Sequence, residues 1–249
     1  AAVQAAQQIA GLLQRKPNAV LGLATGSTPV RLYAELIRLH QTDGLDFREV
    51  TTFNLDEYLG LHPDHPQTFR NWMHAHFFSQ VNLRPERTHV LDSMTRDVEQ
   101  TCAAYENAIA DAGGIDLQIL GIGRNGHIGF NEPSSSLTSR TRIKTLTPQT
   151  LKDNARFFGG DPANVPTHCL TMGIGTILDA HRIMMLAFGD AKAAAVAAAV
   201  EGPLSAALPA SALQLHPHTQ LYLDPPAAAR LQHRETYRWV FEHKPIPAS

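Results

Sequence analysis

The sequence predicts an α/β fold: a single domain over residues 1–249, with an open, mostly parallel sheet covered by helices on both faces. Short strand-like runs alternate with helix-like runs along the chain, which is the order typical of βαβ units. The 249 residues are 43% hydrophobic and 18% charged, enough apolar material for one large core. Pro and Gly are spread between the expected elements and no linker or repeat is visible, so we expect no second domain.

The expected strands are short apolar runs, and they cover residues 19–23, 50–55, 89–91, 115–121, 167–171, 182–188 and 220–223. The helix-like runs between them cover residues 30–40, 68–78, 95–112, 148–157 and 191–200. In such sheets, ligands bind beyond the carboxyl ends of the strands. The polar loops that follow the strands should therefore meet at one edge.

Composition argues against several classes of protein. The 21 Lys and Arg nearly balance the 23 Asp and Glu, and no basic run stands out, so nucleic acid is not an expected partner. The most apolar stretch, residues 191–200, is about half a membrane span, so no membrane partner is expected. Cys102 and Cys169 form neither a disulfide framework nor a CxxC pair, which favours a reducing, cytoplasmic setting. The chain opens without a basic leader, so we expect no signal peptide.

The loop after the first strand is a candidate anion site. Gly26, Ser27 and Thr28 lie between that strand and a helix with Pro in its first turn. Free N–H groups at a helix start, with hydroxyls beside them, can hold a phosphate. An ordinary strand-to-helix turn with a Ser or Thr cap fits the same residues equally well. A tight phosphate site also needs cations, for which Lys192 and Arg156 are candidates, although each alone is more often a solvated surface charge.

Asp56 follows the second strand and is a candidate base. If it is partly desolvated, its carboxylate could take a proton from a carbon next to a carbonyl or imine. The alternative is that Asp56 caps the next helix, and position alone slightly favours that interpretation.

The segment after the fourth strand reads GIGRNG and matches the GxGxxG pattern of dinucleotide sites. No helix begins inside this run and no acid follows at the end of the next strand, so nicotinamide binding is not favoured. The segment better serves to present His127, with Glu132 able to fix the tautomer and orientation of its ring. The glycines around His127 would let a substrate approach the backbone. The other histidines form no zinc pattern, so no metal site is expected.

Together these motifs resemble one family, the glucosamine-6-phosphate deaminases. The resemblance covers essentially the whole chain and rests on LATGSTP, TTFNLDEYLGL, GIGRNGHIGFNEP, SSSLTSRTRIKTLT, ARFF, LTMGIGTILDA, AAVEGP and LQLHPH, in that order. It implies a modified Rossmann-like fold and the conversion of glucosamine 6-phosphate and water to fructose 6-phosphate and ammonia, with no metal or organic cofactor. It also implies a hydrolase of carbohydrate metabolism that acts on amino sugars, within N-acetylglucosamine catabolism.

The resemblance implies a role for each candidate. Asp56 would move a proton between C2 and C1, and His127 would open the sugar ring with support from Glu132. Asn125 would assist the same step, but it stands where some members carry an acid, and an amide can orient its neighbours but cannot take a proton at neutral pH. The substrate phosphate would be held by Gly26, Ser27, Thr28, Arg156 and Lys192.

A second anion site is implied by resemblance alone. Ser135, Ser136, Arg142 and Lys144 match positions that bind N-acetylglucosamine 6-phosphate, an effector, in regulated members that form homo-oligomers. A solvated loop with a basic edge strand is the open alternative. Residues 142–171 could also form a mobile lid that carries one of the phosphate-binding cations over the site.

Two other functions remain open. A 6-phosphogluconolactone hydrolase of the same superfamily would use the phosphate loop and His127, but it has no need of a base for a C2 proton. A non-catalytic sugar-phosphate sensor would not need Asp56 and His127 together. The presence of both residues therefore favours the deaminase.

Overall fold

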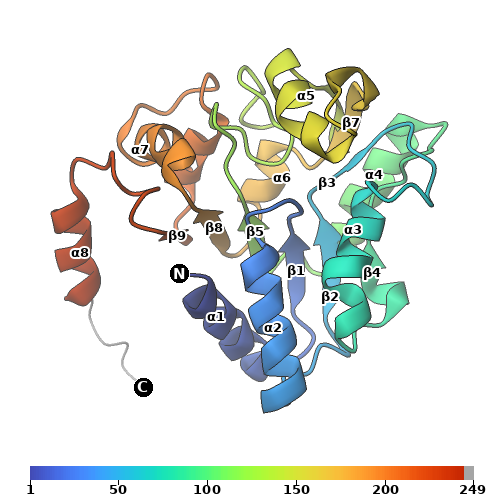
Figure 1. Ribbon diagram of the computed structural model, residues 1–249. Coiled ribbons are helices and arrows are strands. Elements are labelled where there is room, and N and C mark those ends of the chain that lie inside the picture. The colour runs from blue at the N-terminus through green and yellow to red at the C-terminus, as the bar shows by residue number, and fades with distance from the viewer. Residues whose placement is uncertain (244–249) are drawn as a thin grey trace.

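The computed structural model describes residues 1–243, and Figure 1 shows its fold. A six-stranded sheet has the order β4-β2-β1-β5-β8-β9, with every neighbouring pair parallel. The predicted α/β class with a mostly parallel sheet is confirmed. The last six residues of the predicted domain, 244–249, lie outside the described residues. The strands are β1 (Val20–Leu23), β2 (Thr51–Asn54), β4 (Thr88–His89), β5 (Leu117–Leu120), β8 (Ile183–Ala187) and β9 (Thr219–Leu223).

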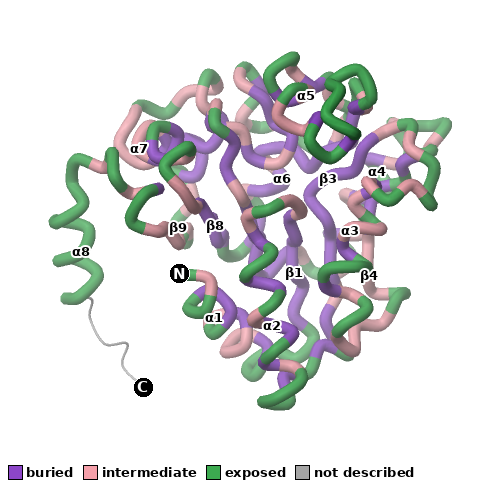
Figure 2. The backbone as a smooth tube through the Cα atoms, in the orientation of Figure 1, coloured by how far each residue is buried: buried purple, intermediate pink, exposed green. Residues whose placement is uncertain are grey.

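The central strands are buried along their whole length. Every residue of β1, β5 and β8 is buried, and β8 reads IMMLA. Continuous apolar runs are typical of parallel strands covered on both faces, since neither side of the strand meets water. Figure 2 shows this buried centre, surrounded by half-buried and exposed helices. The helices are α1 (Ala2–Arg15), α2 (Val30–Asp43), α3 (Phe69–His76), α4 (Val98–Asp111), α6 (Ile174–Leu178) and α7 (Ala193–Glu201).

Helix α2 shows why these elements form where they do. It buries Leu32, Tyr33, Leu36, Ile37 and Leu39, the spacing of one helix face, and it packs beside α1 in front of the sheet (Figure 1). It ends at a glycine in the left-handed conformation, Gly44, with φ of 71°. The loop between the end of β1 at Leu23 and the start of α2 at Val30 lies at the carboxyl end of β1, at the edge of the sheet.

A second, smaller sheet was not expected. It is antiparallel, with the order β3-β7-β6, and consists of β3 (Asp56–Tyr58), β7 (His168–Thr171) and β6 (Arg142–Thr145). The run at 167–171 was expected in the parallel alternation but belongs to this sheet instead. Along β6 half-buried and exposed residues alternate, as in an antiparallel strand with one covered face.

The chain between β6 and β7 forms a helical layer above the small sheet. It contains α5 (Pro148–Asn154) and two short 3-10 turns, η3 (Ala155–Phe157) and η4 (Pro162–Asn164). This layer has its own apolar cluster, separate from the main core, in which Tyr58 contacts Phe130 and Phe158. Residues 142–171, predicted as a lid, thus begin and end in paired strands, and only the part between the strands is helical.

The C-terminal part of the described chain ends in α8 (Arg234–Glu242), which was not expected from the sequence. This helix stands away from the rest of the molecule, and all its residues are exposed (Figures 1 and 2). Among residues 1–243 no helix is long and apolar enough to cross a membrane. The remaining 3-10 turns are η1 (Phe78–Gln80), η2 (Pro85–Arg87), η5 (Asp190–Lys192) and η6 (Pro209–Leu215).

Candidate active site

One cavity of about 640 Å³ opens at the carboxyl ends of β1, β2, β5 and β8. It is lined by the loop that follows β1, by β3, by the glycine-rich loop that follows β5, by α5 with η3, and by η5. Segments far apart in the sequence therefore meet at one place. The residues predicted from the sequence that line it are Gly26, Ser27, Thr28, Asp56, His127, Arg156 and Lys192.

The loop after β1 faces the cavity with free donors. Gly26 has φ of +94°, a backbone conformation that favours glycine, and it turns the chain between β1 and α2. In the described chain the N–H groups of Gly26, Ser27 and Thr28 donate to no protein acceptor. These N–H groups and the two hydroxyls are available to an anion in the cavity.

Four cations line the cavity: Lys192, Arg156, Arg124 and Lys152. The Nζ of Lys192 donates to the carbonyl of Ile122 at 2.7 Å, which aims the amine at the glycine-rich loop. Burial lowers the pKa of Lys192, and the positive charges of Arg124 and Arg156 lower it further, against the opposing charge of Asp153. The sequence analysis did not include Arg124. This basic residue lies inside the GIGRNG segment, and that position could have indicated a further cation at the site.

Asp56 is buried at the cavity, with 7% of its surface exposed. No hydrogen bond to its side chain is present among residues 1–243. Burial raises the pKa of Asp56 to about 8, and the neighbouring charge of Glu57 adds to the rise. A carboxyl that lacks hydrogen-bond donors in an apolar place holds its proton tightly, so as a carboxylate it is a strong base near neutral pH.

The interpretation of Asp56 as a helix cap is wrong, because Glu57 does that work. The Glu57 Oε1 accepts from the N–H of Phe69 at 2.8 Å, and its Oε2 accepts from the N–H of Arg70 at 3.0 Å, both in the first turn of α3. Successive residues of a strand point to opposite faces, so β3 sends Glu57 to the helix and Asp56 to the cavity. The sequence alone did not separate these two adjacent acids.

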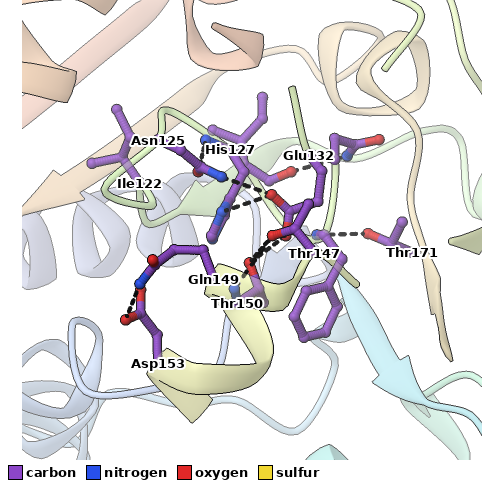
Figure 3. A network of polar contacts seen from close by, with 12 residues as sticks. Ile122, Asn125, His127, Glu132, Thr147, Gln149, Thr150, Asp153 and Thr171 are labelled. Atoms are coloured by element: carbon purple, nitrogen blue, oxygen red, sulfur yellow. Dashed lines mark hydrogen bonds and ion pairs between the residues drawn. The ribbon is translucent and has the colours of Figure 1, made fainter. Parts of the chain in front are cut away.

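His127, Glu132 and Asn125 form one network (Figure 3). The His127 Nδ1 lies 3.7 Å from Glu132 Oε2. The Asn125 amide donates to the same Oε2 at 2.8 Å, and its Oδ1 accepts from the His127 N–H at 3.2 Å. Asn125 therefore contacts both the backbone of His127 and the side chain of Glu132, a geometry in which it can orient the pair.

Two threonines that sequence reasoning missed complete this network. Thr150 donates to Glu132 Oε1, and Thr147 lies 3.3 Å from the same oxygen. Burial raises the pKa of Glu132, but the imidazole of His127, the Thr150 hydroxyl and the Asn125 amide outweigh it and lower that pKa to about 2. Glu132 is thus an ionised carboxylate beside the imidazole. In the sequence Thr147 and Thr150 only indicate the start of a helix.

The glycines near His127 make room for protein side chains, and Gly121, Gly123 and Gly129 also line the cavity, where their backbone is open to a substrate. A Cβ at Gly123 would lie 2.3 Å from the imidazole of His127. A Cβ at Gly126, which has φ of +80°, would lie 2.4 Å from Leu208. Both positions are therefore restricted to glycine by packing, and Gly123 lets the ring lie against the backbone.

The four predicted effector residues lie on two separate segments. Ser135 is buried, while Ser136 is exposed and shares a hydrogen bond with Thr138. Arg142 and Lys144 are alternate residues of β6, and burial lowers the pKa of Arg142. Within residues 1–243 no hydrogen bond or ion pair joins the two serines to the two cations.

Residues 1–243 contain no group of three or more His, Cys, Asp or Glu side chains that could hold a metal ion.

Comparison with known proteins identifies the family. Residues 1–222 match the family described as glucosamine-6-phosphate isomerases/6-phosphogluconolactonase, so the chain belongs to this family. It is 57% identical over 235 residues to a glucosamine-6-phosphate deaminase of Hahella chejuensis, covering 94% of this chain and 89% of that protein. It is 54% identical over 241 residues to one of Mycolicibacterium smegmatis, covering 97% and 92% of the two chains.

Solved structures agree on the fold. A monomeric glucosamine-6-phosphate deaminase has a TM-score of 0.90 and 46% identity, covering 92% of this chain and 95% of that one. A 6-phosphogluconolactonase from Thermotoga maritima has a TM-score of 0.69 at 19% identity, covering 89% and 92%, and shows a shared fold alone.

The expected assignment to the hydrolases is wrong. The matched family is described by its isomerases, and the relatives at 54 to 57% identity are named deaminases. These findings support a deaminating isomerase of amino-sugar metabolism and not a hydrolase.

Proposed function

We propose that this protein converts glucosamine 6-phosphate to fructose 6-phosphate and ammonia through aldose–ketose isomerisation. The observation that carries the proposal is that a buried carboxylate and an imidazole, which lies 3.7 Å from Glu132, line the same cavity as a loop with free N–H donors and four cations. An anchored sugar phosphate would place its C1 and C2 within reach of groups that move protons. The deaminase relatives support the choice of an amino sugar.

The phosphate is the anchor of the substrate. Gly26, Ser27 and Thr28 supply N–H groups and hydroxyls, and Lys192 and Arg156 supply charge. Hydrogen bonds between ionised partners are the strong ones, so this end of the cavity carries most of the binding energy. Binding energy at a remote group can hold the reacting carbons in place.

Ring opening is the first chemical step, and His127 performs it. The cyclic sugar has no free aldehyde, so the O1 hydroxyl must lose a proton and the ring oxygen O5 must gain one. The imidazole can do both in turn, because a ring nitrogen can accept a proton and then donate it. Glu132 and Asn125 hold its position. Asn125 orients without relaying a proton.

Asp56 then moves the proton that defines the isomerisation. In the open-chain aldehyde the C2 hydrogen is acidic; Asp56 takes it, and an enolamine forms. Return of a proton to C1 gives the imine of the ketose. Water adds at C2 and ammonia leaves, which yields fructose 6-phosphate. A lactonase would have no use for this base, and the buried, unpaired state of Asp56 therefore supports the deaminase.

Regulation and assembly belong to the same proposal. We propose that Ser135, Ser136, Arg142 and Lys144 bind N-acetylglucosamine 6-phosphate and that the chain forms a homo-oligomer. The paired cations on β6 support an anion site. The solved relative at 46% identity is described as monomeric, so mass and effector response need to be measured together.

The remaining proposals concern organisation and setting. Residues 1–249 form one domain, and residues 142–171 form a lid whose glycines, Gly159 and Gly160, have positive φ and open space around them. A cytoplasmic setting is supported by Cys102 and Cys169, which are both free and buried.

An ammonia-release assay with glucosamine 6-phosphate in deuterated water tests the function. We expect ammonia and fructose 6-phosphate in equal amounts, with deuterium at C1 of the product. The same preparation is assayed with 6-phosphogluconolactone as the competing substrate and with added N-acetylglucosamine 6-phosphate. Turnover without deuterium at C1 contradicts the enolamine route, and activity on the lactone alone contradicts the deaminase.

A further inference from the structure

The carboxylate of Glu132 lies between two segments of the chain, with one oxygen directed at each (Figure 3). Its Oε2 faces the glycine-rich loop, where Asn125 and His127 contact it. Its Oε1 faces the first turn of α5, where Thr150 and Thr147 contact it. A carboxylate that accepts hydrogen bonds on both oxygens is fixed in rotation, so the donors on Oε1 determine where Oε2 points.

Thr150 is placed for this contact by the start of α5. The Thr147 hydroxyl caps the helix by accepting from the N–H of Thr150 at 3.3 Å. This cap directs the Thr150 side chain inward, where it is 4% exposed. The contact with Glu132 spans 18 positions of sequence, and it is a bond between two buried groups.

The segment that carries Thr150 also reaches the phosphate end of the cavity. Arg156 follows α5 directly, on η3, and lines the cavity. The end of α5 is tied to the small sheet, since Asn154 donates to the Tyr58 hydroxyl at 3.0 Å. The position of α5 and η3 therefore determines both where Arg156 lies and where the Thr150 hydroxyl contacts Glu132.

We propose that Thr150 is a positioning residue for the ring-opening step: it holds Glu132 Oε1 so that Oε2 faces His127, and so it couples the segment carrying Arg156 to the imidazole. This inference rests on the proposed function. Without the Thr150 hydroxyl, the carboxylate gains freedom to rotate and the ring of His127 loses its fixed partner. Thr150 also lines the cavity, but its hydroxyl donates to Glu132, and the end of α5 stays tied to Tyr58 through Asn154, so we expect binding of the phosphate to persist.

The experiment compares Thr150→Val, which keeps shape and removes the donor, with Thr150→Ser, which keeps the donor. We expect Thr150→Val to lower kcat about tenfold, the effect of one lost hydrogen bond to a charged group, with KM nearly unchanged. Thr150→Ser should retain most of the wild-type kcat. Thr150→Ala, which removes the same donor without adding bulk, is assayed beside them so that a folding defect in one variant is recognised.

A matched control lies on the same helix. Gln149 donates to Asp153 at 2.9 Å on the exposed side of α5 and makes no contact with Glu132. Gln149→Ala should weaken the helix slightly and leave kcat unchanged. A fall in kcat equal to that of Thr150→Val would show that general loosening of α5 is responsible, which overturns the proposal.

A double-mutant cycle with Glu132→Gln separates a positioning role from a merely structural one. If Thr150 acts through Glu132, Thr150→Val should have little further effect on kcat once Glu132 is changed. Equal losses in both backgrounds, or a Thr150→Ser variant as slow as Thr150→Val, would overturn the proposal.

The NMR chemical shifts of the His127 ring give a readout that does not require turnover. We expect them to change in Thr150→Val and to remain at the wild-type values in Thr150→Ser and Gln149→Ala. An unmoved signal in Thr150→Val overturns the coupling. Wild-type protein that releases no ammonia while the signal shifts as expected would contradict the proposed function and leave the coupling supported, so the two failures are distinguishable.

Discussion

The two sheets differ in how they are built and in what they give to the cavity. The six-stranded sheet is parallel, and its central strands are buried throughout; the loops at its edge carry the anion-binding donors and Lys192. The three-stranded sheet is antiparallel and short, and it carries Asp56 on β3. In the proposed function, the anchor for the substrate comes mainly from the large sheet, with Arg156 added by the layer above the small sheet, and the base comes from the small sheet itself.

His127 lies where the two layers join. Its loop leaves the large sheet after β5 and is then held by the chain of the small one. The N–H of Phe130 donates to Thr171 at 3.1 Å, and the Asn131 amide donates to the carbonyl of Met172 at 2.8 Å. We therefore expect substitutions on β3 to change kcat, and substitutions of the cations in the loops at the edge of the large sheet to change KM.

The largest effect is expected at β3. Asp56→Asn removes the base and should lower kcat about 10² to 10⁴-fold, the usual contribution of a positioned base. Binding of the sugar phosphate should persist, since the anchor is untouched. Calorimetric titration with a slowly turned-over substrate analogue and an ammonia assay measure the two properties. An unchanged kcat would remove Asp56 from the mechanism.

Lys192→Ala should give the opposite pattern. Lys192 is half-buried, and loss of its charge-assisted contact to the phosphate should raise KM roughly 10- to 100-fold with little change in kcat. Steady-state kinetics with glucosamine 6-phosphate measure both constants. A fall in kcat alone would mean that Lys192 acts in the chemical step, and the comparison between the sheets would fail.

Arg124 should contribute less, because its side chain is exposed at the cavity. Arg124→Gln is expected to raise KM about two- to fivefold, the range of a solvent-screened charge pair. Arg124→Lys, which keeps the charge, serves as control and should stay close to the wild type. The increase should shrink as salt is added, since exposed charges are screened. An effect independent of salt would point to a role other than charge.

The smallest effect concerns stability. The pKa of Asp56, about 8 in the folded chain, lies above its ordinary value of 3.8, so the folded state binds the proton more tightly than the unfolded chain. The protonated Asp56 carboxyl therefore makes its full contribution to the free energy of unfolding below pH about 4. This contribution is lost as the pH rises through about 8. Asp56→Asn lacks this loss, so its Tm should exceed that of the wild type at pH 8 by a few degrees and by less at pH 5. A constant difference would contradict a strongly raised pKa.

Sequence reasoning succeeded where local patterns are sufficient. Runs such as IMMLA in β8 indicate buried parallel strands, and the loops after them were placed at one edge. It missed β3 as a strand because three residues, Asp56 to Tyr58, carry no periodic signal, and their partner β7 lies far along the chain. Sequence therefore located Asp56 at the edge but could not tell its fate from that of Glu57.

The candidate site was incomplete for the same reason. Thr147 and Thr150 fit a helix start, and that local role is real, yet their contact with Glu132 depends on how α5 folds back over the loop. In the sequence Arg124 is only one residue of the GIGRNG segment, and the structure shows that it lines the same cavity as Lys192. Long-range contacts of this kind are set by packing, and no spacing in the sequence encodes them.

The pairing of β3 with β7 has one more consequence. Asp56 lies opposite Thr171 and Glu57 opposite Leu170, and neighbouring side chains of a strand face opposite ways. A slip of one position would turn Glu57 into the cavity and leave the N–H groups of Phe69 and Arg70, in the first turn of α3, without their acceptor. Such a chain would keep its composition and its outline while presenting a longer acid to the sugar. The alignment of a three-residue strand thus decides which of two adjacent acids faces the cavity.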